Sequence, residues 1–136
     1  MKKLLLLPLL FATCFCLAQD AKEIIGKPIK IGKLLIAQYD IPYSNWSDAK
    51  KSCASLGVGW RLPTKIELNT MFMNKDSIRG FAYSGYGAGF YYWSSTLSNP
   101  KNVWIQDFAN GNQIDFDSYY SSNKVVKYYG RAVKIF

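Results

Sequence analysis

The chain has 136 residues, a formal net charge of +8 and no histidine. Histidine is the commonest general base and the commonest metal ligand, so its absence argues against an enzyme and against a metal site. The length suits one domain with its own core, and no apolar run after residue 17 is long enough to cross a membrane.

The N-terminus has the pattern of a secretory signal peptide. Lys2 and Lys3 precede an apolar run, Leu4 to Leu17, that is shorter than the ~20 residues of a membrane helix. We expect cleavage before Gln19, which removes residues 1–18 and lowers the formal charge from +8 to +6 because two lysines leave. This predicts export to the periplasm, the cell surface or the medium. A retained membrane anchor and a lipid anchor on Cys14 are the alternatives, and the sequence favours neither.

The mature chain begins with a polar lead-in, which we assign to residues 19–32. Residues 33–39 have the composition of a strand, and residues 40–44 are interpreted as a turn around Pro42. The folded domain is therefore expected over residues 33–136.

A first helix is predicted from about residue 45 to residue 56. Asn45 suits its N-cap, Gly57 suits its end, and one face carries apolar residues at helical spacing, namely Trp46, Ala49, Cys53 and Leu56. Signal cleavage leaves Cys53 as the one cysteine, so no internal disulfide can form. We expect a small buried hydrophobe at this position, with a free thiol or an intermolecular disulfide as alternatives.

A second helix is predicted over residues 64–73. Thr64 and Glu67 form a capping box, and Pro63 holds the chain before it extended. Arg61 is expected to pair with a carboxylate or with backbone carbonyls near this cap. The large apolar residues of this motif and of the later strands are expected in the core: Trp60, Leu62, Trp93 and Trp104.

Residues 74–90 are predicted to be a long connecting loop, because glycines at 80, 85, 87 and 89 interrupt any periodic pattern. Loops of this length in compact domains often bind ligands, and a merely decorative excursion is the alternative.

The last third of the chain is predicted to be β-structure. Residues 103–108 and 114–119 flank an Asn-Gly turn signal and form a hairpin. A two-residue loop would pair Phe108 with Gln113. A three-residue loop with Gly111 left-handed would pair Phe108 with Asn112, and we favour it because it places more apolar residues on one face: Trp104, Phe108, Ile114 and Phe116. Residues 125–136 form the closing strand.

An ordered set of motifs resembles the Lcl C-terminal domain family over roughly residues 33–136. The matching motifs are Trp46-Ser47-Asp48-Ala49 with Cys53 and Leu56, Gly59-Trp60-Arg61-Leu62-Pro63-Thr64 with Glu67-Leu68, Tyr92-Trp93-Ser94-Ser95-Thr96, Trp104 to Phe108 with Gly111, and Arg131-Ala132-Val133-Lys134. The resemblance implies an α+β, C-type-lectin-like fold: two helices on a small twisted antiparallel sheet, a long loop, and terminal strands near each other. The family's namesake is implicated in adhesion and in binding sulfated glycosaminoglycans.

Two departures from related sequences affect the expected chemistry. Family members often carry a cysteine where this chain has Ala132, so Cys53 lacks that partner. Calcium-dependent lectins have an acidic or amide ligand where this chain has Lys101, and calcium requires several oxygen ligands. We therefore interpret Asp107, Asp115 and Asp117 as a solvated hairpin face, with a metal site as the alternative.

No residue pattern predicts catalysis. A lone cysteine without histidine has no activator, and no serine lies in a nucleophile elbow. In the tyrosine doublets of the predicted strands, one ring of each pair is expected to face outward. The candidate ligand-binding residues are Lys101, Lys124, Lys127, Arg131, Lys134, Tyr120 and Tyr128.

The sequence thus predicts an exported, non-enzymatic binding or adhesion module that recognises acidic glycans, such as glycosaminoglycans, or other polyanions without calcium. The alternative is a structural or protein-interaction subunit of a bacterial surface assembly. No cofactor, metal or nucleic acid is expected.

Overall fold

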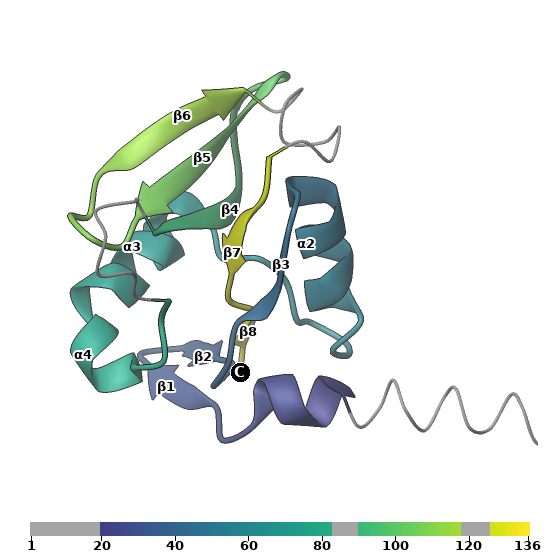
Figure 1. Ribbon diagram of the computed structural model, residues 1–136. Coiled ribbons are helices and arrows are strands. Elements are labelled where there is room, and N and C mark those ends of the chain that lie inside the picture. Colours follow the sequence, from purple (N-terminus) through teal and green to yellow (C-terminus); the bar gives the residue numbers. More distant parts are fainter. Residues whose placement is uncertain (1–19, 83–89, 118–125) are drawn as a thin grey trace, which may run out of the picture.

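The computed structural model describes residues 20–82, 90–117 and 126–136, which form an α+β domain (Figure 1). In chain order its elements are β1 (Ile29–Ile31), β2 (Leu34–Ile36), β3 (Ile41–Ser44), α2 (Trp46–Ala54), α3 (Lys65–Met73), α4 (Lys75–Ile78), β4 (Tyr91–Asn99), β5 (Asn102–Asp107), β6 (Gln113–Asp117), β7 (Tyr128–Gly130) and β8 (Val133–Ile135). Residues 20–25 form a further helical segment.

The strands form two sheets. The smaller sheet has the order β1-β2-β8 and is antiparallel, so it brings strands from the two ends of the domain together. The larger sheet has the order β3-β7-β4-β5-β6 and is antiparallel except between β4 and β7, where Tyr92 pairs with Tyr129 in parallel. In Figure 1, α2 lies on one side of the larger sheet, and α3 with α4 on the other.

The core has two parts, one on each face of the larger sheet. Cys53 of α2 and Trp93 of β4 belong to the first part, together with Trp60 and Leu62 from the segment before α3. The second part contains Leu68 and Met71 of α3, Ile78 of α4, and Phe90, Tyr92 and Phe108. Trp60, Leu62 and Trp93 are buried, as the sequence predicts.

The helix α2 occupies the predicted range. The backbone N–H of Asp48 donates to the Asn45 side chain at 2.9 Å, so Asn45 is the N-cap. Cys53 is a free cysteine and is completely buried, which confirms the prediction of a small buried hydrophobe. Burial raises the pKa of its thiol to about 12.

Three segments for which the sequence predicts neither helix nor strand have regular structure. The lead-in contains the helical segment 20–25 and strand β1, and Ala21, Ile24 and Ile25 pack on the core. The predicted turn at residues 40–44 is strand β3, which is compatible with Pro42 because β3 is the edge of its sheet. The predicted loop 74–90 begins with α4, which the buried Ile78 anchors.

The hairpin of β5 and β6 has neither of the two predicted registers. Gly111 has φ +84° as expected, but Ile105 pairs with Ile114 and Val103 with Phe116. The turn starts earlier because the Asp107 carboxylate accepts the N–H groups of Ala109 at 2.8 Å and of Phe90 at 3.3 Å.

This register changes the place of two aromatic residues. Trp104 lies opposite Asp115, and it is half-buried with the Lys65 ammonium 3.3 Å from its ring centroid, so the prediction that Trp104 belongs to the core is wrong. Phe108 lies beyond the end of β5 and packs in the second part of the core. Asp107 is buried, so the three hairpin aspartates do not form one solvated face.

The predicted closing strand is divided into β7 and β8, which belong to different sheets. The division falls at Arg131 and Ala132, where the chain leaves the larger sheet. Arg61 and Val133 then exchange backbone hydrogen bonds of 3.0 and 2.9 Å, which join the motif before α3 to the start of β8.

Candidate functional site

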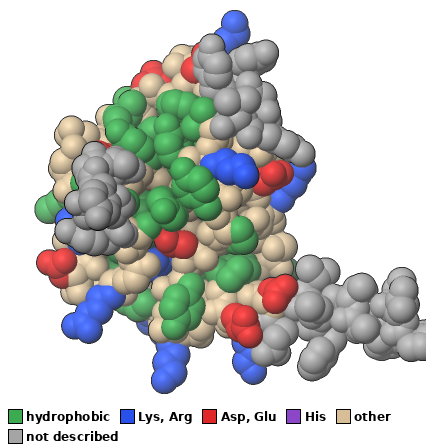
Figure 2. All heavy atoms as spheres, viewed as in Figure 1, with side chains coloured by type: hydrophobic (Ala, Val, Ile, Leu, Met, Phe, Trp, Pro, Cys, Tyr) green, Lys and Arg blue, Asp and Glu red, His purple; other side chains and the backbone are tan. Residues whose placement is uncertain are grey.

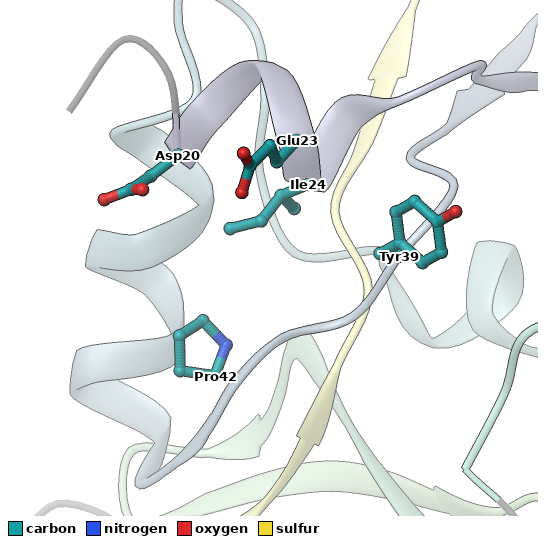
Figure 3. A pocket seen from close by; sticks show the side chains of 5 residues that line it. All are labelled: Asp20, Glu23, Ile24, Tyr39 and Pro42. Carbon is teal, nitrogen blue, oxygen red and sulfur yellow. The ribbon is translucent and has the colours of Figure 1, made fainter. Parts of the chain in front are cut away.

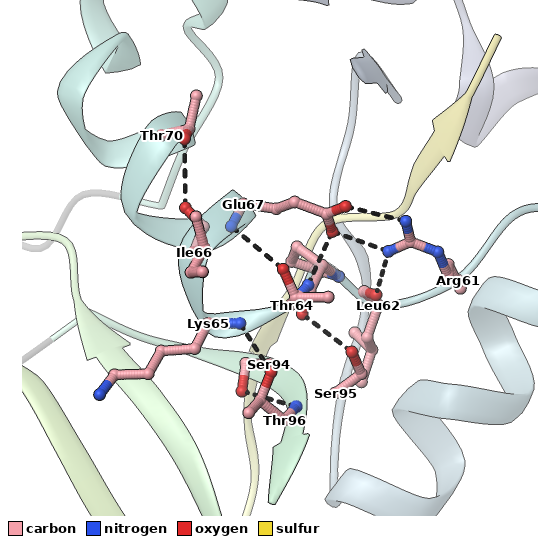
Figure 4. A network of polar contacts seen from close by, with 11 residues as sticks. Arg61, Leu62, Thr64, Lys65, Ile66, Glu67, Thr70, Ser94, Ser95 and Thr96 are labelled. Carbon is pink, nitrogen blue, oxygen red and sulfur yellow. Dashed lines mark hydrogen bonds and ion pairs between the residues drawn. The ribbon is translucent and has the colours of Figure 1, made fainter. Parts of the chain in front are cut away.

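The capping-box motif is a structural junction (Figure 4). The Arg61 guanidinium donates two hydrogen bonds to Glu67, with N–O distances of 2.7 and 2.8 Å, and Glu67 also accepts the backbone N–H of Thr64. The hydrogen bond from Arg61 is the largest of the effects that hold the pKa of Glu67 below its ordinary value. These groups therefore satisfy each other's hydrogen bonds at the start of α3.

The same junction attaches the start of α3 to β4. The backbone N–H of Lys65 donates to the Thr96 hydroxyl at 2.8 Å, and the backbone N–H of Ser95 donates to the Pro63 carbonyl at 2.8 Å (Figure 4). The motif around residues 61–67 therefore has two structural roles. It starts α3, and it joins the start of α3 to β4.

Arg131 is not an exposed ligand-binding cation. Its side chain is fully buried, and its Nε donates to Asp40 at 2.5 Å. The guanidinium also donates to the carbonyls of Gln38 at 2.9 Å and Gly80 at 2.6 Å. The sequence-based assignment of Arg131 to a ligand site is therefore wrong, because its donors are used inside the domain.

Asp40 connects this guanidinium to β4. The Tyr92 hydroxyl donates to Asp40 at 2.8 Å and accepts the backbone N–H of Ala82 at 2.7 Å. Burial raises the pKa of Asp40 despite the opposing effect of Arg131, and burial together with the negative charge of Asp40 raises the pKa of Tyr92. The network fixes the segment before β3 and the turn after α4 to the sheet.

The other predicted cations do not form one cluster. Lys101 lies in the turn between β4 and β5, and the half-buried Lys134 lies on β8 of the smaller sheet, at the other end of the molecule (Figure 1). Lys127 is exposed immediately before β7. Lys124 and Tyr120 lie outside the described residues.

A group of four tyrosines is the feature most suited to binding a ligand. We call Tyr43, Tyr91, Tyr128 and Tyr129 the tyrosine cluster. It consists of two ring pairs on either side of β7, because Tyr91 and Tyr128 pack on the first part of the core and Tyr129 packs on the second. The ring centroids of Tyr43 and Tyr129 are 4.9 Å apart, and those of Tyr91 and Tyr128 are 5.2 Å apart. Tyr43 is 53% exposed and the other three are half-buried. Figure 2 shows hydrophobic side chains gathered over the part of the molecule where Figure 1 draws the larger sheet.

The hydroxyls of the cluster influence one another. Burial raises the pKa of Tyr43, and Tyr129 raises it further. Burial also raises the pKa of Tyr128, with additional effects from Tyr91 and Tyr43. The Tyr43 and Tyr128 hydroxyls therefore stay protonated at neutral pH, so each can donate a hydrogen bond to a ligand oxygen.

Sequence reasoning identified Tyr128 but not the cluster as a whole. The expectation that one ring of each doublet faces outward fits the doublet 91–92, where Tyr92 is buried and Tyr91 is half-buried. In the doublet 128–129 both rings are half-buried. Tyr43 was missed because its segment was interpreted as a turn, and only the pairing of β3 with β7 places its ring on Tyr129.

The described residues also line two depressions in the surface. The larger, of about 500 Å³, lies between the helical segment 20–25 and the chain entering β3, and we call it the acidic cleft (Figure 3). Ile24, Tyr39 and Pro42 supply its apolar walls, and Asp20 and Glu23 supply carboxylates. This charge makes it unsuitable for a polyanion.

The smaller depression, of about 320 Å³, is formed by α4, the turn after it and Phe108. We call it the basic pocket because Lys75 and Arg79 line it against one carboxylate, Asp76. The sequence pointed to this region only through the expectation that the loop 74–90 binds a ligand.

Two general properties concern the described part of the chain alone. Within residues 20–82, 90–117 and 126–136, no three side chains of the metal-ligating types are grouped so that they could hold an ion. The described helices are too short or too polar for any of them to cross a bilayer.

The chain was compared with curated proteins and with models of protein families. None of the curated proteins matches the chain in sequence. The model of the Lcl C-terminal domain matches residues 23–134. This range contains all the named helices and strands of the described structure except the last residue of β8. It also includes half of the helical segment 20–25. The chain therefore belongs to the Lcl C-terminal domain family.

Proposed function

We propose that this protein is an exported, non-enzymatic binding and adhesion module that recognises acidic glycans or other polyanions without calcium. The observation that carries this proposal is the tyrosine cluster, two partly exposed ring pairs that meet at β7, with the exposed Lys127 directly before that strand. Flat aromatic rings suit the apolar faces of sugar rings, and a neighbouring ammonium suits an acid group.

The rings of the cluster are held in place by the core. Tyr129 stacks on the buried Tyr92 with centroids 5.5 Å apart, and Tyr128 packs on the buried Trp93 at 4.8 Å. A surface whose rings are already fixed loses little conformational entropy when a ligand binds. This is the property expected of a site that binds a flexible polymer.

A C-type-lectin-like fold is part of the same proposal. It is supported by the pairing of β2 with β8 and by α2 and α3 lying on opposite sides of the larger sheet. Membership of the Lcl C-terminal domain family supports the proposed fold as well. Export is proposed from the signal-peptide pattern of residues 1–18, and the charge of +6 after cleavage favours an anionic partner.

The test is retention of the mature chain on heparin resin, at low and at physiological salt, with and without a chelator. We expect retention that weakens with salt and is unaffected by the chelator, because exposed charges are screened over ~8 Å at physiological ionic strength. Retention that the chelator abolishes, or no retention at low salt, contradicts the proposal.

Two matched variants locate the site. Tyr43→Ala removes a ring of the cluster, and Tyr39→Ala removes a ring of equal exposure, 52% against 53%, at the acidic cleft. We expect Tyr43→Ala to weaken binding of a heparin-derived tetrasaccharide by about tenfold, which is ~1.4 kcal/mol, and Tyr39→Ala to leave it unchanged. Equal effects of the two variants would show that the cluster is not the site.

A protein partner is the second candidate, and a different surface favours it. Ile66 and Met73 on α3 are 79% and 72% exposed and are seven residues apart, so they lie on one side of the helix. Binding through this surface would resist salt and would depend on Ile66, whereas glycan binding would not. A glycan array probed at two ionic strengths distinguishes the two candidates.

A further inference from the structure

The basic pocket has the size and composition of a site for one small acidic group on a ring. Its volume of about 320 Å³ is at the lower end of the range for ligand sites, roughly 300–1,000 Å³. Phe81 and Phe108 lie in its wall with ring centroids 4.7 Å apart, and Lys75 and Arg79 line it as cations.

Arg79 is held at this pocket by a strained backbone. Among the described residues it is the one non-glycine residue with a positive φ, at φ 62° and ψ 177°, a conformation that is nearly restricted to glycine. The buried Arg131 guanidinium fixes this turn, because it donates to the carbonyls of Gly80 at 2.6 Å and of Arg79 at 3.4 Å. A glycine would fit this position without strain, yet the sequence has an arginine.

The guanidinium of Arg79 is not consumed by internal bonds. In the described structure its hydrogen bond is the one from Nε to the Asp76 carbonyl at 3.3 Å, and its side chain is exposed. The Lys75 ammonium lies 4.7 Å from the Phe72 ring centroid. The terminal nitrogens of Arg79 are therefore available as a fork, the geometry that matches a carboxylate or a sulfate.

A row of rings connects the basic pocket with the tyrosine cluster. Phe81 contacts Tyr92 at 5.5 Å between centroids, Tyr92 contacts Tyr129 at 5.5 Å, and Tyr129 contacts Tyr43 at 4.9 Å. The two surface features thus share one rigid aromatic support, although Tyr92 itself is buried.

We propose that the basic pocket binds the carboxylate or sulfate of one sugar unit, with the Arg79 fork as the specific contact, at one end of an acidic oligosaccharide that lies on the Tyr43 and Tyr129 pair of the tyrosine cluster. This inference rests on the proposed function and assigns its acid-recognising residues. It separates the two roles, because the rings bind sugar faces and Arg79 selects the charged group.

The experiment uses the mature chain and two probes. Binding of a heparin-derived tetrasaccharide is measured by calorimetry, and binding of the monosaccharide glucuronate by changes in the amide spectrum at residues 75–82. Arg79→Gly and Arg79→Ala both remove the fork, while Lys51→Gln removes one exposed charge from α2, outside both features. We expect about tenfold weaker tetrasaccharide binding for both Arg79 variants and less than about twofold for Lys51→Gln.

Thermal stability provides the second readout. Arg79→Gly relieves the positive φ and Arg79→Ala retains it, so the glycine variant should have the higher Tm while both lose affinity. Tetrasaccharide binding within about twofold of wild type for both Arg79 variants overturns the inference and leaves the proposed function standing.

The remaining outcomes separate the two claims. If wild type fails to bind the tetrasaccharide but glucuronate perturbs residues 75–82 in an Arg79-dependent way, the acid-binding pocket is supported and the proposed polymer binding is not. If neither probe binds, both claims are wrong.

Discussion

The side chain of Arg131 joins segments that are far apart in the sequence. It bonds to Asp40, to the carbonyls of Ala37 and Gln38 before β3, and to the turn after α4. A lysine keeps the charge but presents no planar fork, so it cannot reach all of these acceptors. In the lysine variant, the buried carbonyls would lack donors and Asp40 would be poorly paired, and both effects lower the free energy of unfolding.

We therefore expect Arg131→Lys to lower the free energy of unfolding by about 3 kcal/mol, a large share of an ordinary total of ~5–15 kcal/mol. Urea unfolding of the mature chain measures this. Lys127→Gln, a change at an exposed cation nearby in the sequence, serves as the control and should stay within ~0.5 kcal/mol. A loss below ~1 kcal/mol for Arg131→Lys would mean that these bonds contribute little.

Cys53 gives a second prediction at the scale of one residue. Its thiol is fully buried and its pKa is raised to about 12 by that burial, so almost no thiolate exists at pH 8. We expect a thiol reagent to label the native protein only as fast as the protein unfolds, and to label it at once in denaturant. Rapid labelling in the native state would show that the α2 face is open to solvent.

At the scale of an element, the start of α3 links folding to pH. The pKa of Glu67 is lower in the folded protein than its ordinary value of 4.5, chiefly because Arg61 donates hydrogen bonds to it. A group with a depressed folded pKa stabilises fully above its unfolded pKa, and this contribution disappears as the pH falls through the folded pKa.

Glu67→Gln should therefore cost about 1 kcal/mol at pH 7, and the difference from wild type should shrink as the pH falls below 4.5. Urea unfolding of both proteins across this range measures the difference. A gap that stays constant with pH would show that the helix cap, and not the ion pair with Arg61, is what Glu67 contributes.

The elements also show which parts of the structure the sequence could predict. Both main helices were predictable because their signals are local: a cap, a stop and an apolar face within about ten residues. The strands are harder to predict from the sequence, because β3 depends on a partner strand that comes some 85 residues later. The division into β7 and β8 depends on bonds from Arg131 to distant carbonyls.

The candidate site was only partly predictable for the same reason. An exposed lysine such as Lys127 can be guessed from its type, but the burial of Arg131 depends on Asp40, which is 91 positions away. The tyrosine cluster needs three strands to be neighbours before its rings meet. The side chains of the candidate site come from different strands, so no local sequence pattern predicts that they are in contact.

At the scale of the whole molecule, charge is divided between separate regions. The acidic cleft holds Asp20 and Glu23, whereas the basic pocket holds Lys75 and Arg79. The net charge of +8 for the whole chain therefore does not give the local charge of either depression. We expect an anionic polymer to be oriented by this division, with the basic pocket toward the polymer and the acidic cleft away from it.

The order of the smaller sheet has a mechanical consequence. β1 and β8 run in the same direction on either side of β2. Ile29, at the start of β1, pairs with Ile36 at one end of β2. Ile135, at the end of β8, pairs with Leu34 at the other end of β2. A pull on the two ends of the chain would therefore act at opposite ends of the sheet, along the strands. Such a load shears the hydrogen bonds of both ladders together and does not peel them one by one, which suits a domain that carries tension.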